Sequence, residues 1–204
     1  MTDRTRPRRE LLAFDRADRW GVLALLVVVS AATLLSQVLS RVVGWVRGED
    51  LLVPTFGPVE VPALDAAGVR HSEGSYDVHL ADPTSAQRVL DLVPGVLVTA
   101  LAVAACLLLV ALVRDLAAGD PFRERAAMRL WLLAIVLAVG LPVAWFARAT
   151  VDVVLLTGMD LGAGGPGIVL SLPWVPVLAG TVIALVATAF RTGEQLREDV
   201  EGLV

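Results

Sequence analysis

Four apolar runs, each long enough to cross a lipid bilayer as a helix, constrain this chain more than any other feature. A spanning helix needs about 20 predominantly apolar residues. None of the runs contains an acidic residue, and the mean hydropathy of the 204 residues is +0.73, too apolar for a soluble domain. The runs are residues 20–43, 93–113, 130–149 and 168–190. We therefore predict an all-α membrane protein with four transmembrane helices and a single membrane domain, residues 1–204.

The tryptophans agree with these boundaries, because each lies near one end of a run and none lies in the middle. An indole ring favours the head-group layer, where its N–H can remain hydrated. The five are Trp20, Trp45, Trp131, Trp145 and Trp174.

The distribution of arginine predicts the orientation. The chain has no lysine, which is typical of a GC-rich bacterial genome, and 12 of its 17 basic residues fall in two tails and one loop. These segments are residues 1–19, 114–129 and 191–204. By the positive-inside rule they are cytoplasmic, so residues 44–92 and 150–167 form outer loops. We predict a multi-pass protein of the bacterial cytoplasmic (inner) membrane with both termini in the cytoplasm.

The first outer loop is predicted to carry a small β element. Residues 51–53 and 59–61 read as short extended segments on either side of a turn at Phe56-Gly57-Pro58. Residues 76–80 alternate apolar and polar side chains, as a half-buried strand does. Thr84 or Ser85 is then expected to cap a helix that leads into the second span.

The same loop contains both histidines of the chain, His71 and His79, close to Glu73 and Asp77. Their spacing matches no metal-ligand signature, so we predict no metal site. An outer-loop sensor that uses these groups is retained as an alternative function.

The first span carries a polar stripe at helical spacing, made of Ser30, Thr33, Gln37 and Ser40. Hydroxyl and amide groups in lipid need partners, so this face is predicted to pack against other helices. The alternative is a small-solute channel or transporter, which requires a wet cavity lined by these four side chains.

Small residues at four-residue spacing predict close helix contacts in the other spans. We expect a compact four-helix bundle, with dimerisation through one such face as an alternative. The residues concerned are Gly95 and Thr99, Ala100 and Ala104, Ala134 and Ala138, and Gly180, Ala184 and Thr188.

Within these boundaries no span contains Asp, Glu, Lys or His, the groups on which proton relays and ion-coupled carriers depend. Arg41 and Arg148 lie at outer ends, from which they are expected to snorkel to the head groups. The chain has no phosphate-binding glycine loop, zinc signature or nucleophile elbow, and its net charge is −4. We predict no enzymatic activity, no catalytic residues, no cofactor and no nucleic-acid binding.

The strongest helix-end signals in the chain lie in the inner loop. Gly119 is expected to end one helix and Asp120 to cap the next, with Pro121 at its first position. The sequence Gly119-Asp120-Pro121-Phe122, followed by Arg129 at the next span, resembles the inner-loop signature of a bacterial membrane family, domain of unknown function 2975. The segment from Phe190 through Gly193 to Leu196, with the last residues of the chain, is similar to the ending of that family.

The resemblance implies a four-span fold along almost the whole chain but no activity, because the family has no settled function. Ala126 stands where members often carry Asn, so a contact made by that Asn is absent or replaced. Members are often accompanied by a small helix-turn-helix regulator, which suggests a cytoplasmic protein partner. We hypothesise a regulatory surface formed by Asp120–Arg129 together with Phe190–Val204, both on the cytoplasmic face.

Overall fold

The computed structural model describes residues 16–58, 73–117, 124–157 and 173–201. Four of its helices are long and apolar enough to cross a membrane: Trp20–Arg47, Ser85–Asp115, Arg125–Leu156 and Trp174–Gly193. The prediction of a mostly helical chain with four candidate spans is therefore confirmed. The helices extend past the apolar runs, so they include charged residues that the predicted spans left out.

Two of the spans are continuous α-helices, and the other two each contain one wide π-helical turn. The second span is α4 (Ser85–Ala117) and the fourth is α7 (Trp174–Glu201). The first comprises α2 (Arg16–Leu34), η1 (Leu35–Leu39) and α3 (Ser40–Arg47), and the third comprises α5 (Glu124–Ile135), η3 (Val136–Gly140) and α6 (Leu141–Leu156).

The π turn in the third span has a local cause in Pro142. A proline ring cannot donate an N–H and collides with the carbonyl four residues earlier. Directly before it, the N–H of Leu141 donates to the carbonyl of Val136, five residues back. The wider turn accommodates the ring, so the helix continues through the proline.

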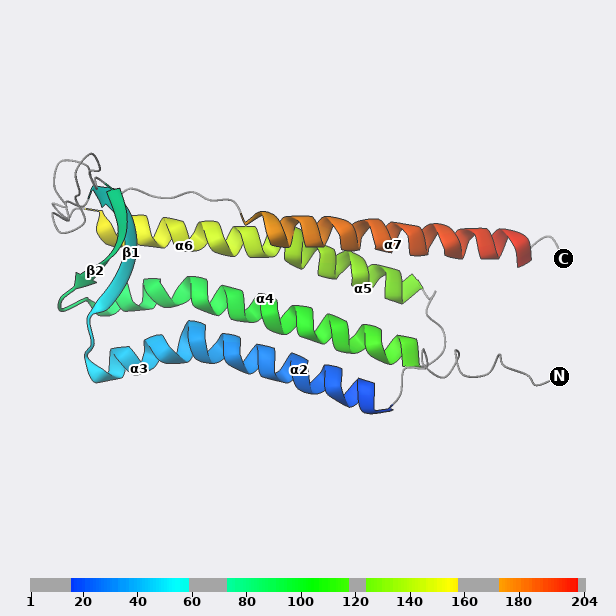
Figure 1. Cartoon of the computed structure of the whole chain (residues 1–204), viewed down its shortest axis with the longest axis horizontal. Coiled ribbons are helices and arrows are strands. Elements are labelled where there is room, and N and C mark those ends of the chain that lie inside the picture. The colour runs from blue at the N-terminus through cyan, green and yellow to red at the C-terminus, as the bar shows by residue number, and fades with distance from the viewer. Residues whose placement is uncertain (1–15, 59–72, 118–123, 158–172, 202–204) are drawn as a thin grey trace, which may run out of the picture.

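The helices lie side by side in chain order as an open row, and the predicted compact bundle is wrong in this respect. The main contacts join α2 to α4, α4 to α5 and α6, and α7 to α5 and η3. Figure 1 shows α2 and α7 at opposite edges of the row. Lipid chains cover apolar side chains as well as another helix does, so no hydrophobic force closes the row into a ring.

Neighbouring helices approach closely where the spacing of small residues predicts it. A Cβ atom added to Gly95 would lie 2.4 Å from the backbone oxygen of Gln37. One added to Gly180 would lie 2.6 Å from the backbone nitrogen of Ala138. Glycine is therefore required at both crossings, one between the first span and α4 and one between α7 and the third span.

A two-stranded antiparallel hairpin, β1 (Leu51–Pro58) and β2 (Glu73–Leu80), covers one end of the row. The predicted turn at Phe56-Gly57-Pro58 is wrong, because these residues continue β1 and pair with Ser75, Gly74 and Glu73. Both strands of a two-stranded sheet are edge strands, where a proline without an N–H is tolerated. The predicted strand at residues 76–80 is confirmed within β2, and residues 59–61 lie outside the described residues.

The hairpin rests on the last turns of α6. Val53 and Leu80 are buried in one apolar cluster with Val151, Leu155 and Leu156. We call this the hairpin end of the row, and the opposite end, where α2 begins and α7 ends, the terminal end (Figure 1).

The start of α4 confirms the predicted cap. The Thr84 hydroxyl accepts the N–H of Gln87 at 3.3 Å, and the Gln87 side-chain oxygen accepts the N–H of Thr84 at 2.8 Å. This reciprocal capping box fixes where α4 begins, and hence where Asp91 stands two turns later.

Candidate functional site

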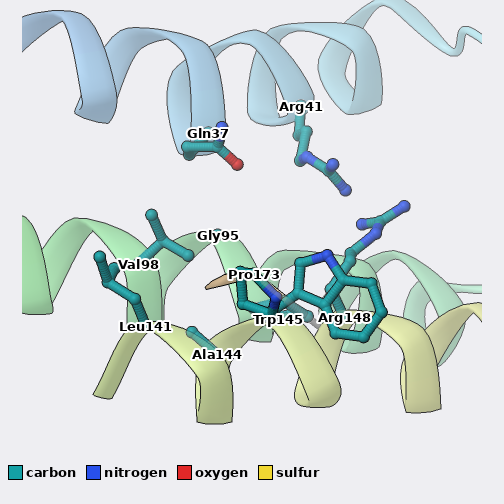
Figure 2. A pocket seen from close by; sticks show the side chains of 10 residues that line it. Gln37, Arg41, Gly95, Val98, Leu141, Ala144, Trp145, Arg148 and Pro173 are labelled. Atoms are coloured by element: carbon teal, nitrogen blue, oxygen red, sulfur yellow. The ribbon is translucent and has the colours of Figure 1, made fainter. Parts of the chain in front are cut away.

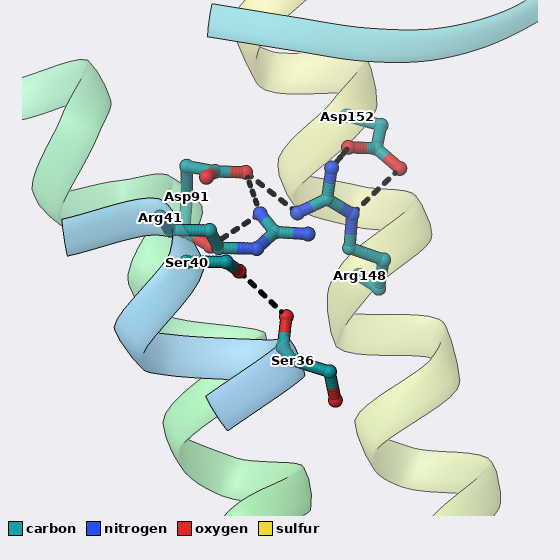
Figure 3. Close-up of polar contacts among 6 residues, drawn as sticks. All are labelled: Ser36, Ser40, Arg41, Asp91, Arg148 and Asp152. Carbon is teal, nitrogen blue, oxygen red and sulfur yellow. Dashed lines mark hydrogen bonds and ion pairs between the residues drawn. The ribbon is translucent and has the colours of Figure 1, made fainter. Parts of the chain in front are cut away.

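A buried carboxylate, Asp91 of α4, lies at the centre of the most polar site inside the described part of the chain. It is 1% exposed and accepts hydrogen bonds from two guanidinium groups (Figure 3). Arg41 of α3 donates through Nη1 to the Asp91 side-chain Oδ1 and, at 3.2 Å, to its backbone oxygen. Arg148 of α6 donates through Nη1 to the same Oδ1 at 2.6 Å. One carboxylate thus joins three helices.

Asp152 completes the charge balance from the far side of Arg148. Arg148 Nε donates to Asp152 Oδ2 at 3.1 Å, and Nη2 lies 2.8 Å from Oδ1, within ion-pairing distance. The four residues Arg41, Asp91, Arg148 and Asp152, which we call the charged cluster, carry two positive and two negative formal charges. Buried charges are tolerated when they are paired and hydrogen-bonded in this way.

This arrangement corrects the expectation that Arg41 and Arg148 snorkel freely to the head groups. Their side chains are only 28% and 22% exposed, and both turn toward Asp91. The sequence gives little indication of the charged cluster. Only Arg148 and Asp152, four residues apart on one helix, can be recognised as a pair without the fold. Asp91 lies on the helix predicted to follow Thr84, but nothing in the sequence indicates that its carboxylate faces Arg41 and Arg148.

An apolar pocket of about 310 Å³ adjoins the charged cluster (Figure 2). The guanidinium groups of Arg41 and Arg148 stand at its hairpin end, and the Gln37 amide faces it from η1. The remaining lining is almost entirely apolar and comes from α4, α6 and the residue before α7: Pro94, Gly95, Val98, Leu141, Ala144, Trp145 and Pro173. The pocket therefore offers charge at one end and hydrocarbon at the other.

Of the predicted polar stripe, Gln37 alone lines this pocket. The hydroxyls of Thr33 and Ser40 each donate to a carbonyl one turn back in their own helix, at 2.8 Å. Ser30 is half-buried, and Ser40 is exposed. The channel alternative requires a cavity lined by all four side chains, and only Gln37 of the four lines the pocket beside the charged cluster.

At the terminal end, Arg129 of α5 joins that helix to α4. Its Nη1 pairs with the carboxylate of Asp115 and donates to the carbonyl of Ala111 at 3.1 Å. Ala126, which stands where the resembled family often carries Asn, is buried, so at this position the chain packs a small apolar side chain.

The other motif residues are described only in part. The Gly119, Asp120, Pro121 and Phe122 stretch lies outside the described residues. Phe190 is half-buried in α7, and an added Cβ at Gly193 would have no atom within 4 Å. Leu196 lies in α7, but its side chain is outside the description.

Of the two histidines, His79 alone lies among the described residues. His79 Nδ1 lies 3.9 Å from Asp50 Oδ2, with both side chains exposed. His71 lies outside the described residues. Among the residues that are described, no three His, Cys, Asp or Glu side chains gather in a way that could hold a metal ion.

No family model, curated protein or solved structure matches the chain. The class of protein is therefore defined by the fold and site alone: a helical protein with four candidate membrane spans, a hairpin on one end, and a charged cluster beside an apolar pocket.

Proposed function

We propose that the protein is a non-enzymatic, multi-pass protein of the bacterial cytoplasmic membrane that engages a regulatory protein partner through its cytoplasmic face. The observation that carries this proposal is the length of α7. The helix continues to Glu201, eleven residues beyond the end of the apolar run at Phe190, which is about 16 Å at 1.5 Å per residue. Figure 1 shows this part of α7 projecting past α4 and α5 at the terminal end.

The arginine distribution supports a cytoplasmic location for the terminal end. Of the 17 arginines, 12 fall in residues 1–19, 114–129 and 191–204. The positive-inside rule assigns such segments to the cytoplasm, where a projecting helix meets soluble proteins.

The composition of the projecting segment indicates the chemistry of the partner. Leu196 and Val200 are four residues apart, a spacing that puts apolar residues on one helix face. The same segment contains Glu194, Glu198, Asp199 and Glu201 against one basic residue, Arg197. A partner with an apolar groove and a basic rim fits this sequence, and the resemblance to domain of unknown function 2975 suggests a small helix-turn-helix protein.

Site-specific photo-cross-linking in cells of the native host tests this proposal. A photoreactive residue at position 196 is expected to give one discrete adduct with a soluble protein. The same residue at Val182, a 58% exposed position within the span, serves as the control and is expected to give none. The Phe122→Ala variant is expected to weaken the adduct, because Phe122 belongs to the second motif assigned to this surface. Equal labelling at both positions, or an adduct with lipid alone, would contradict the proposal.

A further inference from the structure

We propose that the pocket beside the charged cluster binds a membrane phospholipid with a singly charged anionic head group. This inference uses residues at the hairpin end and does not depend on the partner proposed for the terminal end. It rests on the unused donors of Arg41, on the charge balance of the cluster, and on the polarity and depth of the pocket.

The two arginines differ in how many of their donors are engaged. All three nitrogens of Arg148 face a carboxylate: Nη1 bonds Asp91, while Nε and Nη2 face Asp152. Arg41 uses only Nη1, for both of its contacts with Asp91. Its Nε and Nη2 have no partner among the described residues. That edge of a guanidinium presents two parallel N–H groups, which match two oxygens of a phosphate or carboxylate.

Gln37 adds an uncharged polar group one turn before Arg41. Figure 2 shows its amide oxygen directed toward the pocket beneath the first span. A head group held by Arg41 thus has a second polar contact within the same pocket.

The charge balance favours a single negative charge. Asp91 is shared between two guanidinium groups through one oxygen, whereas Asp152 compensates Arg148 alone. Arg41 is therefore the less compensated cation and the one that an anionic group would pair with. Because the charged cluster as a whole is neutral, every negative charge on a head group is unbalanced in this site of low polarity, so a singly charged head group costs less than a doubly charged one.

The pocket is polar at one end and apolar at the other, as a phospholipid is. Arg41 stands at the hairpin end, and Val98 and Leu141 line the part nearer the middle of the helices' length. The helix of the first span runs from Arg16 to Arg47, about 48 Å, so when centred it extends about 9 Å past each side of a 30 Å hydrocarbon core. Arg41 is six residues, about 9 Å, from the end of that span at Arg47, close to the boundary where head groups meet acyl chains.

Native mass spectrometry of the full chain in detergent micelles tests the inference, with dioctanoylphosphatidylglycerol as the probe. We expect the phosphatidylcholine of the same chain length to bind about tenfold more weakly, because it has the same phosphate but also a quaternary ammonium, a positive charge that would lie close to the guanidinium groups of Arg41 and Arg148. The Arg41→Gln variant is expected to raise the Kd for phosphatidylglycerol by about the same factor. The matched control is Arg47→Gln on the same helix, where the side chain is 69% exposed; it should leave the Kd unchanged.

A second variant keeps the test decisive if Arg41→Gln perturbs folding. Val98→Phe fills the apolar part of the pocket without touching the charged cluster, and it is expected to abolish binding while the helical circular dichroism is retained. Equal affinity for the two lipids, or unchanged binding in Val98→Phe, overturns the proposal. Laurate offers the same paired oxygens on a free fatty acid. If laurate displaces phosphatidylglycerol at a lower concentration than phosphatidylglycerol itself requires, the phospholipid is overturned as the occupant.

Discussion

Asp91 is the residue whose replacement tests the charged cluster most directly. The Asp91→Asn variant keeps the shape of the side chain but removes the charge that Arg41 and Arg148 share. The cluster then carries two positive charges against one, that of Asp152. Two charge-assisted hydrogen bonds become neutral ones at the same time.

The expected cost follows from the burial of the three groups. Removing one partner of a fully buried ion pair costs about 3–5 kcal/mol. The carboxylate of Asp91 is 2% exposed, but the two arginine side chains are 28% and 22% exposed and keep some hydration. We therefore expect Asp91→Asn to lower the free energy of unfolding by about 2–3 kcal/mol, below the fully buried value.

Reversible unfolding in mixed micelles with increasing sodium dodecyl sulfate, followed by circular dichroism, measures this change. The matched control is Asp82→Asn on the exposed approach to α4, where φ is +55° and asparagine is well tolerated. Its effect should stay within about 0.5 kcal/mol. The double variant Arg41→Gln with Asp91→Asn removes one charge of each sign, so its loss should fall below the sum of the single losses by about 1 kcal/mol or more. A stable Asp91→Asn variant, or strictly additive losses, would refute the reasoning.

Three further predictions concern packing. Gly180→Ala should cost about 1–3 kcal/mol in the same assay, because its Cβ would lie 2.6 Å from the backbone of Ala138, whereas Gly193→Ala, with open space around it, should be neutral or stabilising. Gly48→Ala should cost about 1 kcal/mol, measured in the same way, because Gly48 ends α3 with φ at +71°; an unchanged stability would contradict the assignment of a left-handed cap. Leu155→Ala should lower the free energy of unfolding by about 2–5 kcal/mol, because Leu155 packs against the hairpin, and it should speed proteolysis of β1. An unchanged rate of proteolysis would show that this contact does not hold the hairpin in place.

Local signals were sufficient to find the four long helices, although each helix continues past its apolar run at one end or both. An apolar run of bilayer length needs no partner to be recognised, because a helix satisfies its own backbone hydrogen bonds. The cap at Thr84 and the alternating strand ending at Leu80 were likewise predictable, since each depends on residues adjacent in the chain. The start of β1 was also found, but its continuation through Pro58 was not, because pairing with β2 outweighed the turn signal.

Tertiary structure alone decided the arrangement of the helices and the charged cluster. Spacing of small residues predicted that helices would meet, and they do at Gly95 and Gly180, but it did not distinguish an open row from a closed bundle. The two arrangements use the same close contacts and differ in whether lipid or protein covers the remaining faces. The charged cluster joins Arg41, Asp91 and Arg148, which are 50 and 57 residues apart. No periodicity links such positions, so only the packing of three helices shows that two arginines at the ends of apolar runs converge on one buried carboxylate.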